Sequence, residues 1–304
     1  MTTNHSAADK NPTANVAESP SGDTGAVVGV VGLGNLGLPI ARRLVSSGID
    51  VVSFDVSPVA REAASGLDLA PSLRELAERS DVVLVLVSDA DQCQEVLSEV
   101  EEVTFSASLP SVVVIMASVG PDSVRSLAAP LQKRGVMVVD VPVSGGAAAA
   151  LNGGLSLMVG GASADIAACR GILEILGTVN NMGDLGAGQS AKLANQILFF
   201  GTHAALQEAI ALAEADGVDR TALLQALSGG TADCWSVRHP GFIQETARAY
   251  DVAGIHPPQR PWHKDLRKAV EVTNERGVDA PFTAMLSDLL GDRIDRSVRP
   301  DENV

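Results

Sequence analysis

The chain has 304 residues, of which 46% are hydrophobic and only 3% aromatic, so we expect aliphatic cores large enough for two domains. The net charge of −15, with only 22 Lys and Arg, argues against nucleic acid and anionic membranes as partners. Three scattered cysteines form neither a CxxC pair nor a Cys/His cluster, which predicts buried thiols in a reducing cytoplasm and no metal site. No apolar run is long enough to span a membrane.

The first two segments of the chain differ sharply in composition. Residues 1–25 are rich in polar residues and lack an apolar segment, which predicts a disordered tail rather than a secretory signal. Residues 26–187 alternate short apolar runs with helical patterns, which is typical of an α/β fold with a mostly parallel, doubly wound sheet. We expect strands at 26–31, 50–54, 81–87, 111–116, 136–141, 155–159 and 179–182, and helices at 39–44, 72–79, 89–100, 121–134 and 164–176.

The rest of the chain has an entirely helical pattern. The proline-free stretch 189–216 predicts one helix on the order of 40 Å long, at about 1.5 Å per residue. One small sheet cannot bury so long an apolar helix, so we expect it to join two domains and to pack against a second subunit. Residues 188–292 are therefore predicted to form an all-α substrate and dimerisation domain, and 293–304 a frayed tail. Further helices are expected at 220–228, 241–249, 264–276 and 281–290.

A glycine motif follows the first predicted strand. Gly32, Gly34 and Gly37 have the spacing GxGxxG, with a strand before them and a helix after them. In such a unit the glycines permit a tight turn, the approach of a pyrophosphate and close packing of helix on strand. The helix N-terminus adds N–H groups and a positive dipole for the phosphates. The motif therefore predicts a dinucleotide site, with a merely structural glycine turn as the alternative.

Asp55 ends the second predicted strand, 18 positions after Gly37, where an acid of a dinucleotide fold accepts hydrogen bonds from the adenosine ribose. Its charge would repel a 2′-phosphate, and the next residue is Val56 rather than an arginine, so NAD is favoured over NADP. The alternative is that Asp55 only caps the turn before Pro58. Other candidates for cofactor contacts are Asn35, Leu36, Val87 and Ser88.

Two later segments carry polar groups suited to a small acid. In VPVSGG, the Ser144 hydroxyl and the backbone N–H groups around Gly145 and Gly146 would form an anion cradle, although such a turn is often only structural. Lys192 and Asn195 lie on one face of the long helix. Partial burial and the helix dipole would lower the pKa of Lys192 and suit it to proton transfer near neutral pH. A solvated surface lysine is the commoner explanation for such a residue taken alone.

A series of segments in order resembles the β-hydroxyacid dehydrogenase family, which includes 3-hydroxyisobutyrate dehydrogenase, tartronate semialdehyde reductase and threonate dehydrogenase. These segments are GLGNLGLPIARRL, VIMASVGPDS, DVPVSGGAAAALNGGLSLMVGG, GAGQSAKLANQI, EAIALAEADGVD and HKDL. The resemblance covers roughly residues 26–290. It implies a Rossmann domain, a helical domain joined through the long helix, and a homodimer or homotetramer.

The resemblance also implies roles for individual residues. Lys192 would be the catalytic acid/base, with Asn195 beside it. Ser118, which replaces the family's usual threonine, would lie near the nicotinamide and the substrate. The remaining implied roles are cofactor binding by Gly32, Gly34, Gly37, Asp55 and Lys264, and substrate carboxylate binding by Ser144, Gly145 and Gly146. Trp235 lies in a segment that departs from the family pattern; it is a candidate for lining the substrate pocket, with core packing as the alternative.

The chain departs from the family in two places. IMASVGP at 115–121 replaces the usual D-x-S-T-x-S-P, and 234–262 does not follow the common pattern, so the identity of the hydroxy acid is not predicted. We expect an oxidoreductase that transfers a hydride between NAD and a small β-hydroxy acid resembling 3-hydroxyisobutyrate, glycerate or threonate, with Lys192 as general acid/base. The alternatives are an imine reductase, a class that usually lacks this lysine, and a non-catalytic nucleotide-binding protein.

Overall fold

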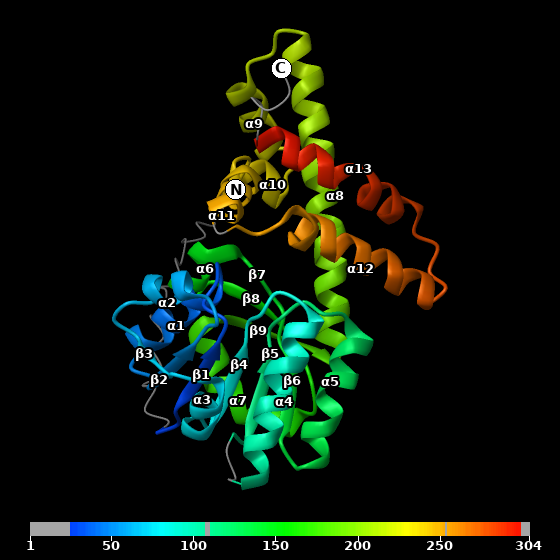
Figure 1. Cartoon of the computed structure of the whole chain (residues 1–304). Coiled ribbons are helices and arrows are strands. Elements are labelled where there is room, and N and C mark those ends of the chain that lie inside the picture. Colours follow the sequence, from blue (N-terminus) through cyan, green and yellow to red (C-terminus); the bar gives the residue numbers. More distant parts are fainter. Residues whose placement is uncertain (1–24, 107–109, 253, 299–304) are drawn as a thin grey trace, which may run out of the picture.

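The structure is a computed structural model that describes residues 25–106, 110–252 and 254–298 (Figure 1). The predicted disordered tail at 1–25 therefore lies outside the described residues except for its last residue, and so do residues 299–304. The described chain has a sheet flanked by helices, and a second, wholly helical part that rises from it along the long helix α8 (Figure 1). None of the described helices combines the length and apolarity that crossing a bilayer requires.

The described residues form one sheet with the strand order β3-β2-β1-β4-β5-β6-β8-β7, and β9 pairs with β8. The pairs from β3 to β6 are parallel, and β8 runs antiparallel to β6 and β7. The order reverses between β1 and β4, which is where a doubly wound sheet binds its ligand. The strands are β1 (Val28–Val31), β2 (Val51–Phe54), β3 (Asp68–Leu69), β4 (Val82–Val85), β5 (Val112–Ile115), β6 (Met137–Asp140), β7 (Val143–Ser144), β8 (Leu155–Gly160) and β9 (Gly177–Gly183).

The central strands are valine-rich because both faces of the sheet are covered. Val30, Val83 and Val113 have no exposed surface, as expected for parallel strands between two helical layers. The thiols of Cys93 and Cys169 lie buried in the cores on opposite faces, as predicted, whereas Cys234 is only half-buried. The core on one face includes residues of α1 (Gly37–Ser46), α6 (Gly146–Asn152) and α7 (Ser163–Leu176), and that on the other includes residues of α3 (Leu73–Arg79), α4 (Ala90–Ser106) and α5 (Pro121–Lys133).

The predicted long helix is confirmed as α8 (Ala187–Ala215). It begins against β8 and β9 and packs farther on against α12 and α13. The helices that follow are α9 (Arg220–Ser228), α10 (Trp235–Arg238), α11 (Phe242–Val252), α12 (Pro261–Glu275) and α13 (Pro281–Val298), with a short 3₁₀ helix at Pro257–Gln259 before α12.

Every predicted strand is present, with ends shifted by at most two residues, whereas some helices and short elements were missed. The helix expected to end at Leu290 continues to Val298, and Ile294 is only 3% exposed. The prediction that a frayed tail begins at 293 is therefore wrong, because Ile294 packs into the same apolar cluster as Leu286 and Leu290. The elements that the sequence did not predict are α2 (Pro58–Ala63), α6, α10, β3, β7 and the 3₁₀ helix at Pro257–Gln259.

A buried cation ties the last helices together. The Arg260 side chain is 2% exposed and forms ion pairs with Asp251 of α11 and, at 2.9 Å, with Asp295 of α13. Asp295 also accepts a hydrogen bond from the Trp262 indole N–H at 3.2 Å and lies 2.7 Å from His263 Nε2. Because α11, α12 and α13 all contribute to this cluster, we expect it to fix their relative positions.

We predict that His203 makes the protein sensitive to acid. His203 on α8 is 4% exposed, and burial lowers its pKa from 6.5 to about 4. Between these values the unfolded chain binds a proton that the folded chain does not, so the free energy of unfolding falls as the pH drops from about 6.5 to 4. Urea unfolding should show that the wild type loses about 2 kcal/mol more than His203→Gln between pH 7.5 and 5. Equal losses in the two proteins would contradict the prediction.

Candidate active site

The glycine loop at the carboxyl end of β1 has the shape that a dinucleotide requires. Gly32 has φ +92°, and a Cβ there would lie 2.6 Å from the carbonyl oxygen of Leu86, while a Cβ on Gly37 would overlap the carbonyl oxygen of Gly32. A Cβ on Gly34 would meet no heavy atom within 4 Å. Gly32 and Gly37 are thus needed for packing, and the backbone at Gly34 is open to a phosphate group. The loop fits the predicted cofactor.

Three predicted cofactor contacts lie in or beside this loop: Asn35, Leu36 and Asp55. Asp55 Oδ2 accepts a hydrogen bond from the Leu33 N–H at 2.6 Å, and Oδ1 accepts one from the Ser57 N–H at 2.7 Å. These two bonds hold the carboxylate beside the loop while also capping the turn, so the two explanations of Asp55 are compatible. Leu36 is the N-cap of α1 and provides no side-chain acceptor, so it leaves the helix start to other acceptors. The side chain of Asn35 lies near the Tyr250 hydroxyl of α11, where it partly opposes the burial that raises the pKa of Tyr250 to about 12.

Val87 and Ser88 follow β4, next to the point where the strand order reverses. The preceding residue, Leu86, donates its N–H to Val31 at 2.8 Å, and its carbonyl lies against Gly32. The Ser88 N–H is bound to the side chain of Gln92 at 3.0 Å, and both predicted residues are half-buried. They therefore lie beside the glycine loop, as a cofactor contact requires.

The first turn of α8 is anchored in the sheet by Asp140, which the sequence did not single out. Asp140 ends β6 and is fully buried. Its two carboxylate oxygens accept the N–H groups of Gly186 and Gln189, each at 2.7 Å. Burial raises the pKa of Asp140 to about 6, although both hydrogen bonds oppose that shift. An acid that ends a valine-rich strand was the signal that could have identified it.

Lys192 lies one turn farther along α8. Lys192 as a whole residue is half-buried, and its amine donates a hydrogen bond to the carbonyl oxygen of Val143 at 2.8 Å. Burial lowers the pKa of Lys192 to about 8, while the charge of Asp265 raises it and that of Lys264 lowers it further. The amine can therefore gain or lose a proton near neutral pH, as its position near the start of the long helix suggested.

The VPVSGG segment lies beside this amine. Val143, whose carbonyl the amine binds, directly precedes Ser144. Gly145 and Gly146 have φ values of +134° and +76°, a backbone that favours glycine. Gly145 is also the N-cap of α6, so the polar turn faces the start of a short helix. The structure thus brings the predicted carboxylate cradle and the predicted acid/base together.

Helix α12 contributes the next charged groups. Lys264 Nζ lies 3.1 Å from the carbonyl oxygen of Ser118 and 2.9 Å from Asp265 Oδ1. Asp265 Oδ2 accepts a hydrogen bond from Gln196 Nε2 at 2.6 Å, and Gln196 accepts one from Asn195 at 3.1 Å. A continuous polar chain therefore connects the loop after β5 with the face of α8 that carries Asn195.

Trp235 lies in an aromatic cluster next to the turn at Gly146. Its ring stacks on His239 at 4.2 Å between centroids and meets the edge of Phe242 at 4.8 Å. Phe242 in turn packs on Gly146, where a Cβ would lie 2.9 Å from the ring. Trp235 therefore borders the predicted substrate site through Phe242, a residue that the sequence did not single out.

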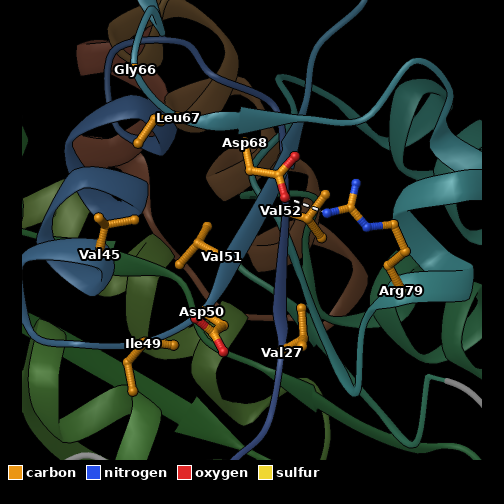
Figure 2. Close-up of a pocket in the computed structure, with 10 residues that line it drawn as sticks. All are labelled: Val27, Val45, Ile49, Asp50, Val51, Val52, Gly66, Leu67, Asp68 and Arg79. Atoms are coloured by element: carbon orange, nitrogen blue, oxygen red, sulfur yellow. Dashed lines mark hydrogen bonds and ion pairs between the residues drawn. The ribbon is translucent and has the colours of Figure 1, made fainter.

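A pocket of about 550 Å³ lies elsewhere, at the amino ends of β1 and β2 (Figure 2). Aliphatic side chains line most of it, together with Asp50 and the ion pair between Asp68 and Arg79. The carboxyl ends of the strands, where the predicted site residues gather, are at the opposite edge of the sheet. This pocket is therefore separate from the candidate site.

Two family models match the chain. One, the NAD binding domain of 6-phosphogluconate dehydrogenase, matches residues 27–186, and the other, described as NAD-binding of NADP-dependent 3-hydroxyisobutyrate dehydrogenase, matches residues 186–303. Solved structures share the fold. The 3-hydroxyisobutyrate dehydrogenase of Mycobacterium tuberculosis with L-serine has a TM-score of 0.73 at 24% identity, covering 90% of this chain and 99% of that one. An imine reductase from Pseudomonas sp. has a TM-score of 0.63 at 20% identity, covering 86% and 91%.

Curated relatives extend the comparison to sequence. Mitochondrial 3-hydroxyisobutyrate dehydrogenase of Mus musculus is 34% identical over 212 residues, which are 69% of this chain and 63% of the mouse protein. The match thus spans less than two thirds of that relative. The 2-hydroxy-3-oxopropionate reductase of Escherichia coli is 31% identical over 266 residues, 86% of this chain and 89% of that protein. Since a family model also matches more than half of the residues, the chain belongs to the β-hydroxyacid dehydrogenase family.

Proposed function

We propose that the protein is an NAD-dependent dehydrogenase of a small β-hydroxy acid, in the range of 3-hydroxyisobutyrate, glycerate and threonate. The observation that carries this proposal is the amine of Lys192, whose pKa burial lowers to about 8, beside the turn at Ser144–Gly146. The names of the relatives, a 3-hydroxyisobutyrate dehydrogenase and a 2-hydroxy-3-oxopropionate reductase, support the same substrate class.

Each residue at the site has a separate role in the proposed reaction. The Ser144 hydroxyl and the N–H groups of Gly145 and Gly146 bind the substrate carboxylate. Neutral Lys192 accepts the proton of the substrate hydroxyl, and Asn195 holds the same oxygen. NAD, when bound, supplies the acceptor for the hydride that leaves the hydroxyl-bearing carbon. In the reverse direction the protonated amine of Lys192 donates its proton to the carbonyl oxygen of the aldehyde or ketone.

The proposal is tested with purified protein and a panel of 3-hydroxyisobutyrate, glycerate, threonate and sulfonated analogues, followed by NADH absorbance. Turnover of at least one carboxylate is expected. If the protein reduces cyclic imines with NADPH and oxidises no hydroxy acid, it is an imine reductase and the proposal is wrong. Thermal stabilisation by NAD without turnover of any compound would favour a non-catalytic nucleotide-binding protein.

Asp55 is proposed to select NAD over NADP. Its carboxylate, held beside the glycine loop by the N–H groups of Leu33 and Ser57, would accept the ribose hydroxyls and repel a 2′-phosphate. Asp55→Ser is expected to lower the preference for NAD over NADP, measured as the ratio of the two affinities, by about 5- to 150-fold, since a single repulsive charge of this kind costs about 1–3 kcal/mol. Binding titrations with both cofactors measure the ratio, and a wild type that already prefers NADP contradicts the assignment.

We also propose that the protein forms a homodimer or homotetramer in the cytoplasm. Residues 26–187 would bind NAD, and the substrate and dimerisation domain, predicted at 188–292, would extend to the end of α13 at Val298. Helix α13 exposes Phe282, Met285 and Leu289 on one face, and Leu198 is exposed on the adjacent α8. Such a row of apolar side chains is suited to a second subunit. The molar mass in solution tests this proposal. The three free cysteines suit a reducing compartment.

A further inference from the structure

We propose that Gln189 is a positioning residue, whose side chain fixes the loop at 117–120 relative to the catalytic amine of Lys192. The inference rests on the proposed dehydrogenase function, because it takes Lys192 as the acid/base of that reaction. Gln189 itself contacts neither the glycine loop nor the turn at Ser144–Gly146; its side chain binds the backbone around Ser118. Its basis is a set of hydrogen bonds that join the loop to the helix turn carrying the amine.

The side chain of Gln189 is buried at 1% exposure, and all of its bonds go to one loop. Its Oε1 accepts the N–H groups of Val119 and Gly120, both at 3.0 Å, and its Nε2 donates to the carbonyl oxygen of Ala117 at 2.9 Å. One carboxamide thus binds the backbone on both sides of Ser118. A buried side chain with three such bonds leaves the loop little freedom to shift.

The helix α5 that follows the loop has no side-chain N-cap that would fix the end of the loop. Gly120 is the N-cap of α5, has φ +91° and offers no side-chain hydrogen bond to the helix start. Gln189 therefore binds the two N–H groups just before the helix, at a turn that no N-cap side chain stabilises. Lys264 contacts the loop from α12, through the Ser118 carbonyl at 3.1 Å, but belongs to a different helix from Lys192.

Gln189 is itself fixed to the sheet. Its backbone N–H is bound to the buried carboxylate of Asp140 at 2.7 Å. Lys192 follows three residues later and reaches Val143, just after the same strand β6. One helical turn therefore carries both the side chain that holds the Ser118 loop and the amine that handles the proton. If Ser118 faces the nicotinamide, this turn sets the spacing between the hydride and proton positions, to which reaction rates are sensitive.

The test compares Gln189→Met, which retains length but loses all three bonds, with Gln207→Met as a control on the same helix. Gln207 is half-buried, and its Nε2 has no hydrogen-bond partner, so the control removes a glutamine without removing such bonds. We expect Gln189→Met to lower kcat by about 10- to 100-fold, since misplacements on the order of 1 Å cost about 100-fold. The Kd for NAD and the KM for substrate should change by less than about threefold.

Two readouts separate positioning from general loss of structure. The primary deuterium isotope effect on kcat should increase in Gln189→Met, because misalignment slows hydride transfer itself. Amide hydrogen exchange at Val119 and Gly120 should accelerate in this variant and not in Gln207→Met. If Gln189→Met does not fold, Gln189→Asn, whose carboxamide is one methylene shorter, undergoes the same measurements.

The proposal is overturned if kcat and the isotope effect remain within twofold of the wild type, or if the exchange of Val119 and Gly120 is unchanged. An equal loss of kcat in Gln207→Met would also overturn it. A wild type that turns over no hydroxy acid would refute the proposed function instead. The exchange measurement needs no turnover, so it still reports whether Gln189 holds the loop.

Discussion

Lys192→Ala is expected to lower kcat by about 10²- to 10⁴-fold, because the variant lacks the group that accepts and returns the substrate proton in general acid–base catalysis. NAD binding should survive, since the glycine loop and Asp55 lie on β1 and β2, away from α8. Stopped-flow turnover and a fluorescence titration with NADH measure the two effects. A variant with ordinary turnover would remove Lys192 from the mechanism.

The titration of Lys192 makes the two directions depend on pH in opposite ways. Oxidation of the hydroxy acid requires the neutral amine, so its rate should rise with pH through about 8, the pKa of Lys192. Reduction requires the protonated amine and should fall over the same range. Lys192→Arg is the matched control, because a guanidinium keeps the positive charge but does not deprotonate near neutral pH. It should be inactive in the oxidative direction at every pH tested.

Arg260→Met is expected to destabilise the helical part by about 3–5 kcal/mol, the cost of removing one partner of a buried ion pair. The change would leave the carboxylates of Asp251 and Asp295 without the buried guanidinium that they share. Urea unfolding, followed by circular dichroism and by the fluorescence of the neighbouring Trp262, measures the loss. Because the network joins α11 to α13, we expect the variant to lose Trp262 packing before the sheet unfolds.

Arg293→Met is the control on the same helix as Asp295. Arg293 pairs with Glu208, but their side chains are 54% and 69% exposed, and such surface pairs contribute about 0–1 kcal/mol. If both variants lose a comparable free energy of unfolding, any substitution on α12 or α13 destabilises these helices. That result would contradict the proposal that the buried ion pairs of Arg260 stabilise them.

The parts of the fold that sequence predicts are those with local signals. Valine-rich runs of four to six residues identified every central strand, because strands buried on both faces need continuous apolar sequence. The glycine spacing and Asp55 placed the cofactor loop, since the chemistry of that loop is contained within one strand–turn–helix unit. Lys192 could be assigned as the acid/base only because the segments around it resemble those of a known family. The structure shows that its neighbours come from distant segments of the chain.

The residues that sequence reasoning missed act through long-range contacts. Gln189 binds a loop about 70 positions earlier, and Asp140 accepts from N–H groups 46 and 49 positions later. No periodicity in a single sequence encodes such pairings. The end of α13 was missed for a different reason, since the charged residues around Ile294 suggested fraying while that one side chain fills the core.

The cap that Asp140 places on α8 has a consequence for the conditions under which the protein works. The carboxylate accepts the two N–H groups most strongly while it is ionised, and its pKa is about 6. Lys192, one turn along, donates a proton only below about pH 8. We therefore expect the reductive direction to be fastest in a window between about pH 6 and 8, where Asp140 is ionised and Lys192 is protonated. The acid limit of that window is set by a group that anchors the helix, and the alkaline limit by the group that performs the chemistry.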